Sequence, residues 1–81
     1  MIHELKVIDR FWPDYKSGLK TFSIRKNDRN FAVGDVCIFK LWDENHFVLN
    51  EIVVKKITHI LHDYDSKMVL EKHCILSLGI L

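Results

Sequence analysis

The segment from Gly18 to Asp35 is the most sharply patterned part of this chain, and it is also rich in polar residues. It reads Gly-Leu-Lys-Thr-Phe-Ser-Ile-Arg-Lys-Asn-Asp-Arg-Asn-Phe-Ala-Val-Gly-Asp. On an extended strand, Phe22 and Ile24 share one face, which we expect to pack on the core. The opposite face is expected to carry the chemistry, and its residues are Thr21, Ser23 and Arg25.

Positive charge gathers around the same segment, since Lys20 precedes the strand and Lys26 and Arg29 follow it. Residues 1–30 hold seven Lys or Arg against four Asp or Glu, whereas residues 31–81 hold five against seven. A basic half can meet phosphate groups, although an imbalance this modest also fits a solvated face. Charge alone therefore leaves both interpretations open.

The chain has 81 residues, enough for one small domain spanning residues 1–81. A domain of this size buries only about 60–65% of its unfolded surface, so we expect a shallow groove instead of a deep pocket. Hydrophobic residues make up 48% of the chain and charged residues 28%, which is ordinary for a folded protein.

Short alternating or apolar runs predict a mainly β fold with one or two short helices. The expected strands are Ile2–Ile8, Thr21–Lys26, a central strand Val36–Trp42, a strand from His46 interrupted near Asn50–Glu51 and continuing over Ile52–Leu61, and Cys74–Leu78. A hairpin is expected at Asp43–Asn45, and a loop with a helical turn at Ser66–Leu70. The most economical arrangement is a small closed or half-closed barrel with a helix at one end.

The helix is expected over Arg10–Ser17, with Asp9 as its cap and Gly18 as its stop signal. Pro13 should make this helix short or irregular. We expect its aromatic side chains to point toward the core, and these are Phe11, Trp12 and Tyr15.

Cys37 and Cys74 lie within apolar runs and lack the close spacing of a zinc or redox pair, so they read as core residues of a reducing compartment. The chain begins Met-Ile-His-Glu without a signal-peptide pattern, and no apolar run approaches the ~18–20 residues that span a bilayer. We therefore expect a cytoplasmic protein with no membrane partner.

The Gly18–Asp35 segment, together with His3-Glu4-Leu5-Lys6, Leu41-Trp42 and Ile75-Leu76-Ser77-Leu78, resembles the ASCH branch of the PUA-like superfamily. Within it, the chain is most similar to a small bacterial and phage family of ASCH-like RNA-binding domains of unknown function. The resemblance covers nearly the whole chain and implies a PUA-like β-barrel. That family commonly has Glu where this chain has Ser23, and its early helix Pro falls at Asp9, whereas this chain carries Pro13.

The leading hypothesis is a module that binds RNA or a nucleotide-like ligand in a groove on the barrel. Fixed cations suit phosphate, and hydroxyl groups suit base edges. The candidate ligand-binding residues are Lys20, Thr21, Ser23, Arg25, Lys26, Arg29, His3 and Glu4. Two alternatives are structural: Lys20 and Arg25 could pair with acidic residues, and His3-Glu4 could be an exposed strand end. The acidic residues in question are Glu4, Asp28 and Asp35.

Trp12 reads as a core residue, whereas Trp42 fits either the core or base stacking. His59, His62 and Asp63 are metal-ligand types, but their spacing fits no zinc pattern, so no metal site and no cofactor are expected.

An enzymatic alternative follows from other ASCH relatives, which are amidohydrolases acting on N-acylated cytidine. The chain is similar to their Gly-x-Lys-Thr-x-Thr-x-Arg motif, which places the catalytic Lys and hydroxyl at Lys20 and Ser23. Their catalytic Glu lies in an insertion that this chain lacks, and Glu71 is the only stand-in. A third alternative is an accessory domain that binds a protein partner.

Overall fold

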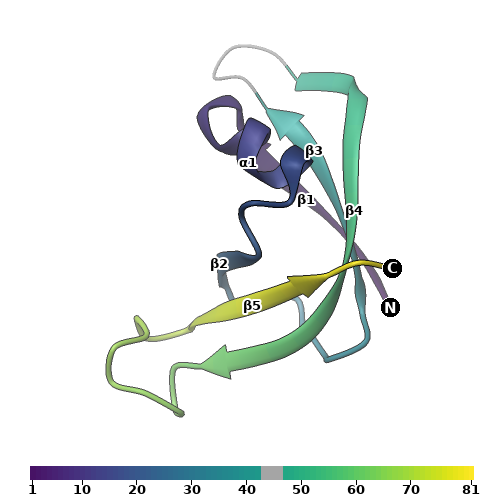
Figure 1. Cartoon of the computed structure of the whole chain (residues 1–81). Coiled ribbons are helices and arrows are strands. Elements are labelled where there is room, and N and C mark those ends of the chain that lie inside the picture. The colour runs from purple at the N-terminus through teal and green to yellow at the C-terminus, as the bar shows by residue number, and fades with distance from the viewer. Residues whose placement is uncertain (43–46) are drawn as a thin grey trace.

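The computed structural model describes residues 1–42 and 47–81, with the side chains of residues 47–50 left aside (Figure 1). The expected hairpin Asp43–Asn45 and the strand start at His46 lie outside the described residues. The elements in chain order are β1 (Ile2–Ile8), a 3₁₀ turn η1 (Asp9–Phe11), α1 (Trp12–Ser17), β2 (Phe22–Lys26), β3 (Val36–Trp42), β4 (Phe47–His62) and β5 (His73–Gly79).

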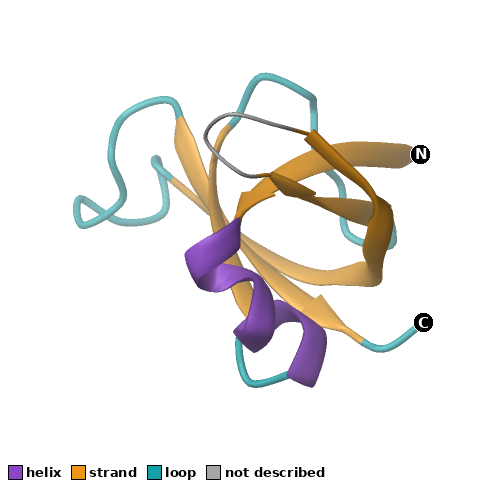
Figure 2. Cartoon of the chain, turned by 90° about the horizontal axis from the view of Figure 1, so that it is seen from above, coloured by secondary structure: helices purple, strands orange, loops and turns teal. Residues whose placement is uncertain are grey.

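The described strands form one sheet in the order β1-β3-β4-β5-β2. β1 runs parallel to β3, and the other neighbouring pairs are antiparallel. The sheet curls into a half-barrel, and α1 lies on one side of the ring that the strands trace (Figure 2). The predicted mainly β, barrel-like fold with a short helix is confirmed at this level.

β3 is an interior strand, between β1 and β4, as its apolar sequence predicts, although β4 is the middle strand of the sheet. The sequence also predicts a break in the fourth strand near Asn50–Glu51. β4 remains a strand through this region, but its register with β3 slips: the pairing passes from Lys40–Ile52 to Trp42–Phe47, so two steps on β3 match five on β4. The polar pair thus marks an irregularity of pairing instead of a strand end.

The core lies on the concave face of the sheet and alternates along β1, β3 and β5 as a period of two requires. Its fully buried members include Phe39, Ile57, Leu76, Cys37 and Cys74. Both thiols are free, and burial raises the pKa of Cys37 to about 11 and also raises the pKa of Cys74. The thiols therefore stay protonated near neutral pH, as small core residues should.

The helix is short, as Pro13 predicts: Pro13 lies in the first turn of α1, and Gly18 ends it in the left-handed conformation with φ 84°. The prediction that Asp9 caps the helix is wrong, because β1 leads directly into η1 and Asp9 is the first residue of that turn. Trp12 and Tyr15 are buried as expected, and the Tyr15 ring lies 4.9 Å from that of Phe39.

The segment between β4 and β5 forms a series of turns. The Val69 N–H donates to the Ser66 carbonyl at 3.2 Å, but the predicted helical turn does not develop into a helix in this described segment. Among the described residues, no helix combines the length and apolar character needed to span a bilayer.

The predicted faces of β2 are reversed. Ser23 is only 1% exposed, whereas Phe22 and Ile24 are 46% and 60% exposed. The reason is the register with β5, in which Ser23 pairs with Leu76 and Arg25 with Cys74. Directly paired residues share a face, and Leu76 and Cys74 are buried, so Ser23 and Arg25 must point inward as well.

Candidate functional site

The two edges of the sheet, β1 and β2, face each other across the open side of the half-barrel. Two arginine side chains reach across to β1, Arg25 from β2 and Arg29 from the segment that follows β2. Arg25 Nη2 donates to the Lys6 carbonyl at 3.1 Å, and Arg29 Nη1 donates to the Glu4 carbonyl at 3.0 Å. We call the depression along this opening, between Lys6 to Ile8 of β1 and Ser23 to Arg25 of β2, the seam groove.

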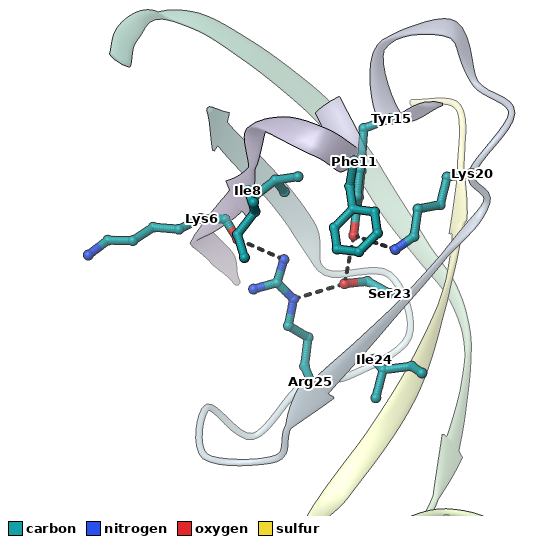
Figure 3. Close-up of a pocket in the computed structure, with 9 residues that line it drawn as sticks. Lys6, Ile8, Phe11, Tyr15, Lys20, Ser23, Ile24 and Arg25 are labelled. Carbon is teal, nitrogen blue, oxygen red and sulfur yellow. Dashed lines mark hydrogen bonds between the residues drawn. The ribbon is translucent and has the colours of Figure 1, made fainter. Parts of the chain in front are cut away.

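The seam groove has a volume of about 330 Å³. Its polar lining consists of Lys6, Tyr15, Lys20, Ser23 and Arg25. The Lys6 side chain points away from the groove in Figure 3, and its ammonium lies 4.2 Å from the centre of the Trp42 ring. The cations directed at the groove are therefore Lys20 and Arg25, and no carboxylate is among the described residues that line it.

Ser23 is the centre of a chain of hydrogen bonds inside the groove (Figure 3). Its Oγ accepts from the Tyr15 hydroxyl at 3.1 Å and from Arg25 Nε at 2.8 Å. Lys20 Nζ in turn donates to the Tyr15 hydroxyl at 3.5 Å. A buried hydroxyl is costly unless it is hydrogen-bonded, and these two donors satisfy the acceptor side of Ser23.

Lys20 is held by aromatic rings. Its ammonium lies 4.8 Å from the ring centres of Phe11 and Tyr15 and 5.0 Å from that of Phe22. Within the described part of the chain, no carboxylate pairs with Lys20. Because these contacts leave its N–H groups uncommitted apart from the long bond to Tyr15, Lys20 can still donate to a ligand.

The carboxylates expected to tie down Lys20 and Arg25 have other partners. Glu4 Oε1 lies 2.8 Å from Lys40 Nζ, and Asp28 Oδ1 lies 3.9 Å from Arg29 Nε. Asp35 binds His3 and the N-terminal ammonium. The structure therefore does not form the ion pairs of the structural alternative, in which Lys20 and Arg25 pair with these carboxylates.

His3 and Glu4 lie apart from the seam groove. His3 is buried, with its Nε2 2.8 Å from Asp35 Oδ2 and its ring 4.7 Å from that of Phe31. The hydrogen bond from His3 is the main reason that the pKa of Asp35 falls to about 2. Glu4 points the other way along β1 and is exposed, so the structure separates this predicted pair.

The remaining candidates divide between neighbouring recesses. Lys26 and Arg29 line a recess of about 160 Å³ that shares Arg25 with the seam groove. Thr21 lies instead in a separate recess with Lys16 and Lys55. The structure thus brings together Lys20, Ser23 and Arg25, with Lys26 and Arg29 beside them, and leaves Thr21 outside.

Glu71 is also distant from the groove. It precedes β5 at the end where Lys26 pairs with His73, whereas Lys20 lies beyond the opposite end of β2. The geometry therefore does not assemble Lys20, Ser23 and Glu71 into one catalytic set.

Two contributors were missed by the sequence reasoning, Phe11 and Tyr15. Tyr15 was expected only as core, yet its hydroxyl links Lys20 to Ser23. The prediction that Phe11 lies in the core is wrong, because Phe11 is 38% exposed and lines the groove. Their spacing of four residues, which brings side chains to one helical face, was the signal available.

Comparison with protein-family models matches residues 2–78 to a domain of unknown function, DUF3850. No curated protein matches the chain.

Proposed function

We propose that this chain, which belongs to the DUF3850 family of unknown function, is a module that binds RNA or a nucleotide-like ligand in the seam groove. The motif resemblance to ASCH-like RNA-binding domains supports this proposal. The curled half-barrel with a short helix at its open side is compatible with the PUA-like barrel that the resemblance implies.

The observation that carries the proposal is the surplus of hydrogen-bond donors in the groove. Ser23 Oγ accepts two bonds, so its own hydroxyl hydrogen is left to donate. Arg25 uses two of its five N–H groups, on Ser23 and the Lys6 carbonyl, and Lys20 has an ammonium with three donors. With no carboxylate in the described lining, such a site suits the oxygens of a phosphate.

The shape of the basic surface favours a strand of nucleic acid over a lone anion. Arg25 lines both the seam groove and the recess that holds Lys26 and Arg29. The cations therefore follow the opening of the half-barrel, and successive phosphates can contact them in turn.

The same contacts argue against Ser23 as a nucleophile. A nucleophilic hydroxyl needs a neighbouring base to take its proton. Ser23 is instead surrounded by donors, Tyr15 and Arg25, and Glu71 lies at the far end of β2. We therefore expect no hydrolysis of N-acetylated cytidine.

The test is an NMR titration of the 81-residue chain with a pentanucleotide RNA and with N-acetylated cytidine, followed over time for product. Backbone shifts should cluster at Lys20, Ser23 and Arg25 without turnover. Lys20→Gln should weaken RNA affinity about 10-fold or more, since a charge-assisted hydrogen bond contributes ~1.5–3 kcal/mol. Lys67→Gln is the matched control, because Lys67 is exposed in the segment between β4 and β5.

Equal losses of RNA affinity in Lys20→Gln and Lys67→Gln would show that the binding is general charge attraction and would overturn the assigned site. Product formation would replace the binding module with the amidohydrolase alternative. No shift with either compound would overturn the proposal and direct the search to a protein partner.

A further inference from the structure

A second recess adjoins the seam groove on the outer side of β2. Its lining consists of Phe11, Asp14, Leu19, Lys20 and Phe22, and its volume is about 500 Å³. This volume falls within the ~300–1,000 Å³ range of small-ligand sites. Phe11 and Lys20 line both depressions, so the recess opens onto the groove. A molecule held in one can reach into the other.

The apolar side chains of this recess are exposed together. Phe22 is 46% exposed and Leu19 is 80% exposed, and both flank Lys20 in the sequence. Contiguous exposed apolar groups on a small domain mark a binding surface more often than scattered single ones. Two of the groups are aromatic, and their rings converge on one atom, Lys20 Nζ.

The neighbourhood of these rings points to the occupant. An aromatic surface beside a donor-rich groove matches a molecule that joins a flat π-system to phosphate. A purely apolar peptide would leave the Lys20 and Arg25 donors without acceptors. A nucleotide satisfies both parts at once, because its base can lie on the rings while its phosphate lies in the groove.

Asp14 adds a preference among bases. Within the described residues its carboxylate has no hydrogen-bond or ion-pair partner, although its backbone carbonyl accepts from the Lys20 N–H at 3.0 Å. A carboxylate accepts hydrogen bonds and repels phosphate, so it fits the base end of a nucleotide. The exocyclic amino group of adenine is a donor that this carboxylate can accept from.

We propose that the recess between Phe11 and Phe22 takes an unstacked base with an exocyclic amino group, from single-stranded RNA whose phosphate lies on Lys20 and Arg25. This inference rests on the function proposed above. Binding exchanges one set of Lys20 contacts for another. The ammonium leaves the rings for the phosphate, since a charge-assisted hydrogen bond is stronger than an exposed cation–π contact, and the vacated ring faces then receive the base.

The experiment compares three five-residue ribo-oligomers that share one backbone: adenosine, purine riboside, which lacks the amino group, and an abasic chain. Wild-type protein should bind the adenosine oligomer about 10-fold tighter than the abasic one, within the roughly 5- to 150-fold range of one base–aromatic stack. It should also prefer adenosine over purine riboside about threefold or more.

Two variants assign these differences to the recess. Phe22→Leu keeps an apolar side chain but removes the ring, so it should weaken binding of the adenosine oligomer more than binding of the abasic one and bring the two affinities close together. Asp14→Ala removes the acceptor and should abolish the preference for adenosine over purine riboside. Thermal melting verifies that both variants are folded.

Equal wild-type affinity for the adenosine and abasic oligomers would overturn the inference, and this comparison needs no variant. If Lys20→Gln still weakened both oligomers, the proposed binding function would stand without the base recess. If wild-type protein bound none of the three oligomers, the proposed function itself would fail.

Discussion

Two buried polar clusters lie toward the two ends of β1, and their hydrogen bonds are balanced differently. At the start of the strand, the Asp35 carboxylate accepts from His3 at 2.8 Å and from the N-terminal ammonium and the Ala32 N–H at 3.1 Å. Toward the other end, Ser23 Oγ accepts from Tyr15 and Arg25. The first cluster matches donors with an acceptor, whereas the second has donors left over and opens onto a groove.

The difference separates a structural cluster from a candidate site. Three donors surround Asp35 and favour its charged form, so the pKa of this carboxyl falls to about 2. Nothing further is needed to neutralise that cluster. The Ser23 cluster has no carboxylate among the described residues and has more donors than acceptors, so a ligand oxygen would complete it. Buried polar groups thus serve stability in one place and, on our proposal, recognition in the other.

The comparison is tested most strongly by Asp35→Ala. The substitution leaves the buried His3 imidazole and the Ala32 N–H without their acceptor, so we expect the Tm to fall by roughly 10 °C or more. Asp28→Ala is the control, because the Asp28 carboxylate is exposed and 3.9 Å from Arg29. Calorimetry or circular dichroism measures both. If the Tm of Asp35→Ala were no lower than that of Asp28→Ala, the Asp35 cluster would not stabilise the fold.

Ser23→Ala should have a smaller effect on stability and a clear effect on binding. Removing Oγ costs about 1 kcal/mol of unfolding free energy, because water in the groove can replace it for Tyr15 and Arg25. RNA affinity should fall about three- to tenfold, since Arg25 loses the contact that orients it. Ser77→Ala, on the neighbouring strand β5, is the matched control.

Urea unfolding and fluorescence anisotropy with a labelled pentanucleotide RNA measure the two effects of Ser23→Ala. Unchanged affinity would mean that Ser23 only fills space beneath β2. A loss of stability as large as that of Asp35→Ala would erase the distinction between the two clusters.

The sequence predicted most of the scaffold because its pattern is local. β1, β3 and β5 alternate or are apolar on both faces, and the helix carries its own stop at Gly18. These signals act within a few residues, so they do not depend on contacts with distant parts of the chain. The sequence also placed Lys20, Ser23 and Arg25 close together, because they are neighbours in the chain, and the structure finds them lining one groove.

The orientation of β2 could not be obtained in this way. Its outward face carries Phe22 and Ile24, which are more apolar than the Ser23 and Arg25 that point inward. Only the register with β5 decides the matter, and register depends on partners about 50 residues away in sequence. The contribution of Tyr15 also depends on the orientation of β2. An aromatic residue on a helix is expected in the core, and only the inward position of Ser23 gives the Tyr15 hydroxyl its hydrogen-bond partner.

Acid unfolding offers the finest test of the comparison. The unfolded chain keeps the Asp35 pKa near 3.8, whereas the folded value is about 2, chiefly because of the His3 hydrogen bond and then the N-terminal ammonium and Ala32 N–H. On acidification the unfolded state therefore binds this proton first, so the stabilisation is complete above pH 3.8 and is lost as the pH falls toward 2. In urea unfolding between pH 5 and pH 2, the free energy of unfolding of wild type should approach that of Asp35→Asn as the pH falls. The difference in free energy of unfolding between wild type and Ser23→Ala should stay constant over the same pH range, because the Ser23 cluster contains no carboxylate. A constant gap to Asp35→Asn would mean that the charge of Asp35 contributes nothing, and that the two clusters differ in geometry alone.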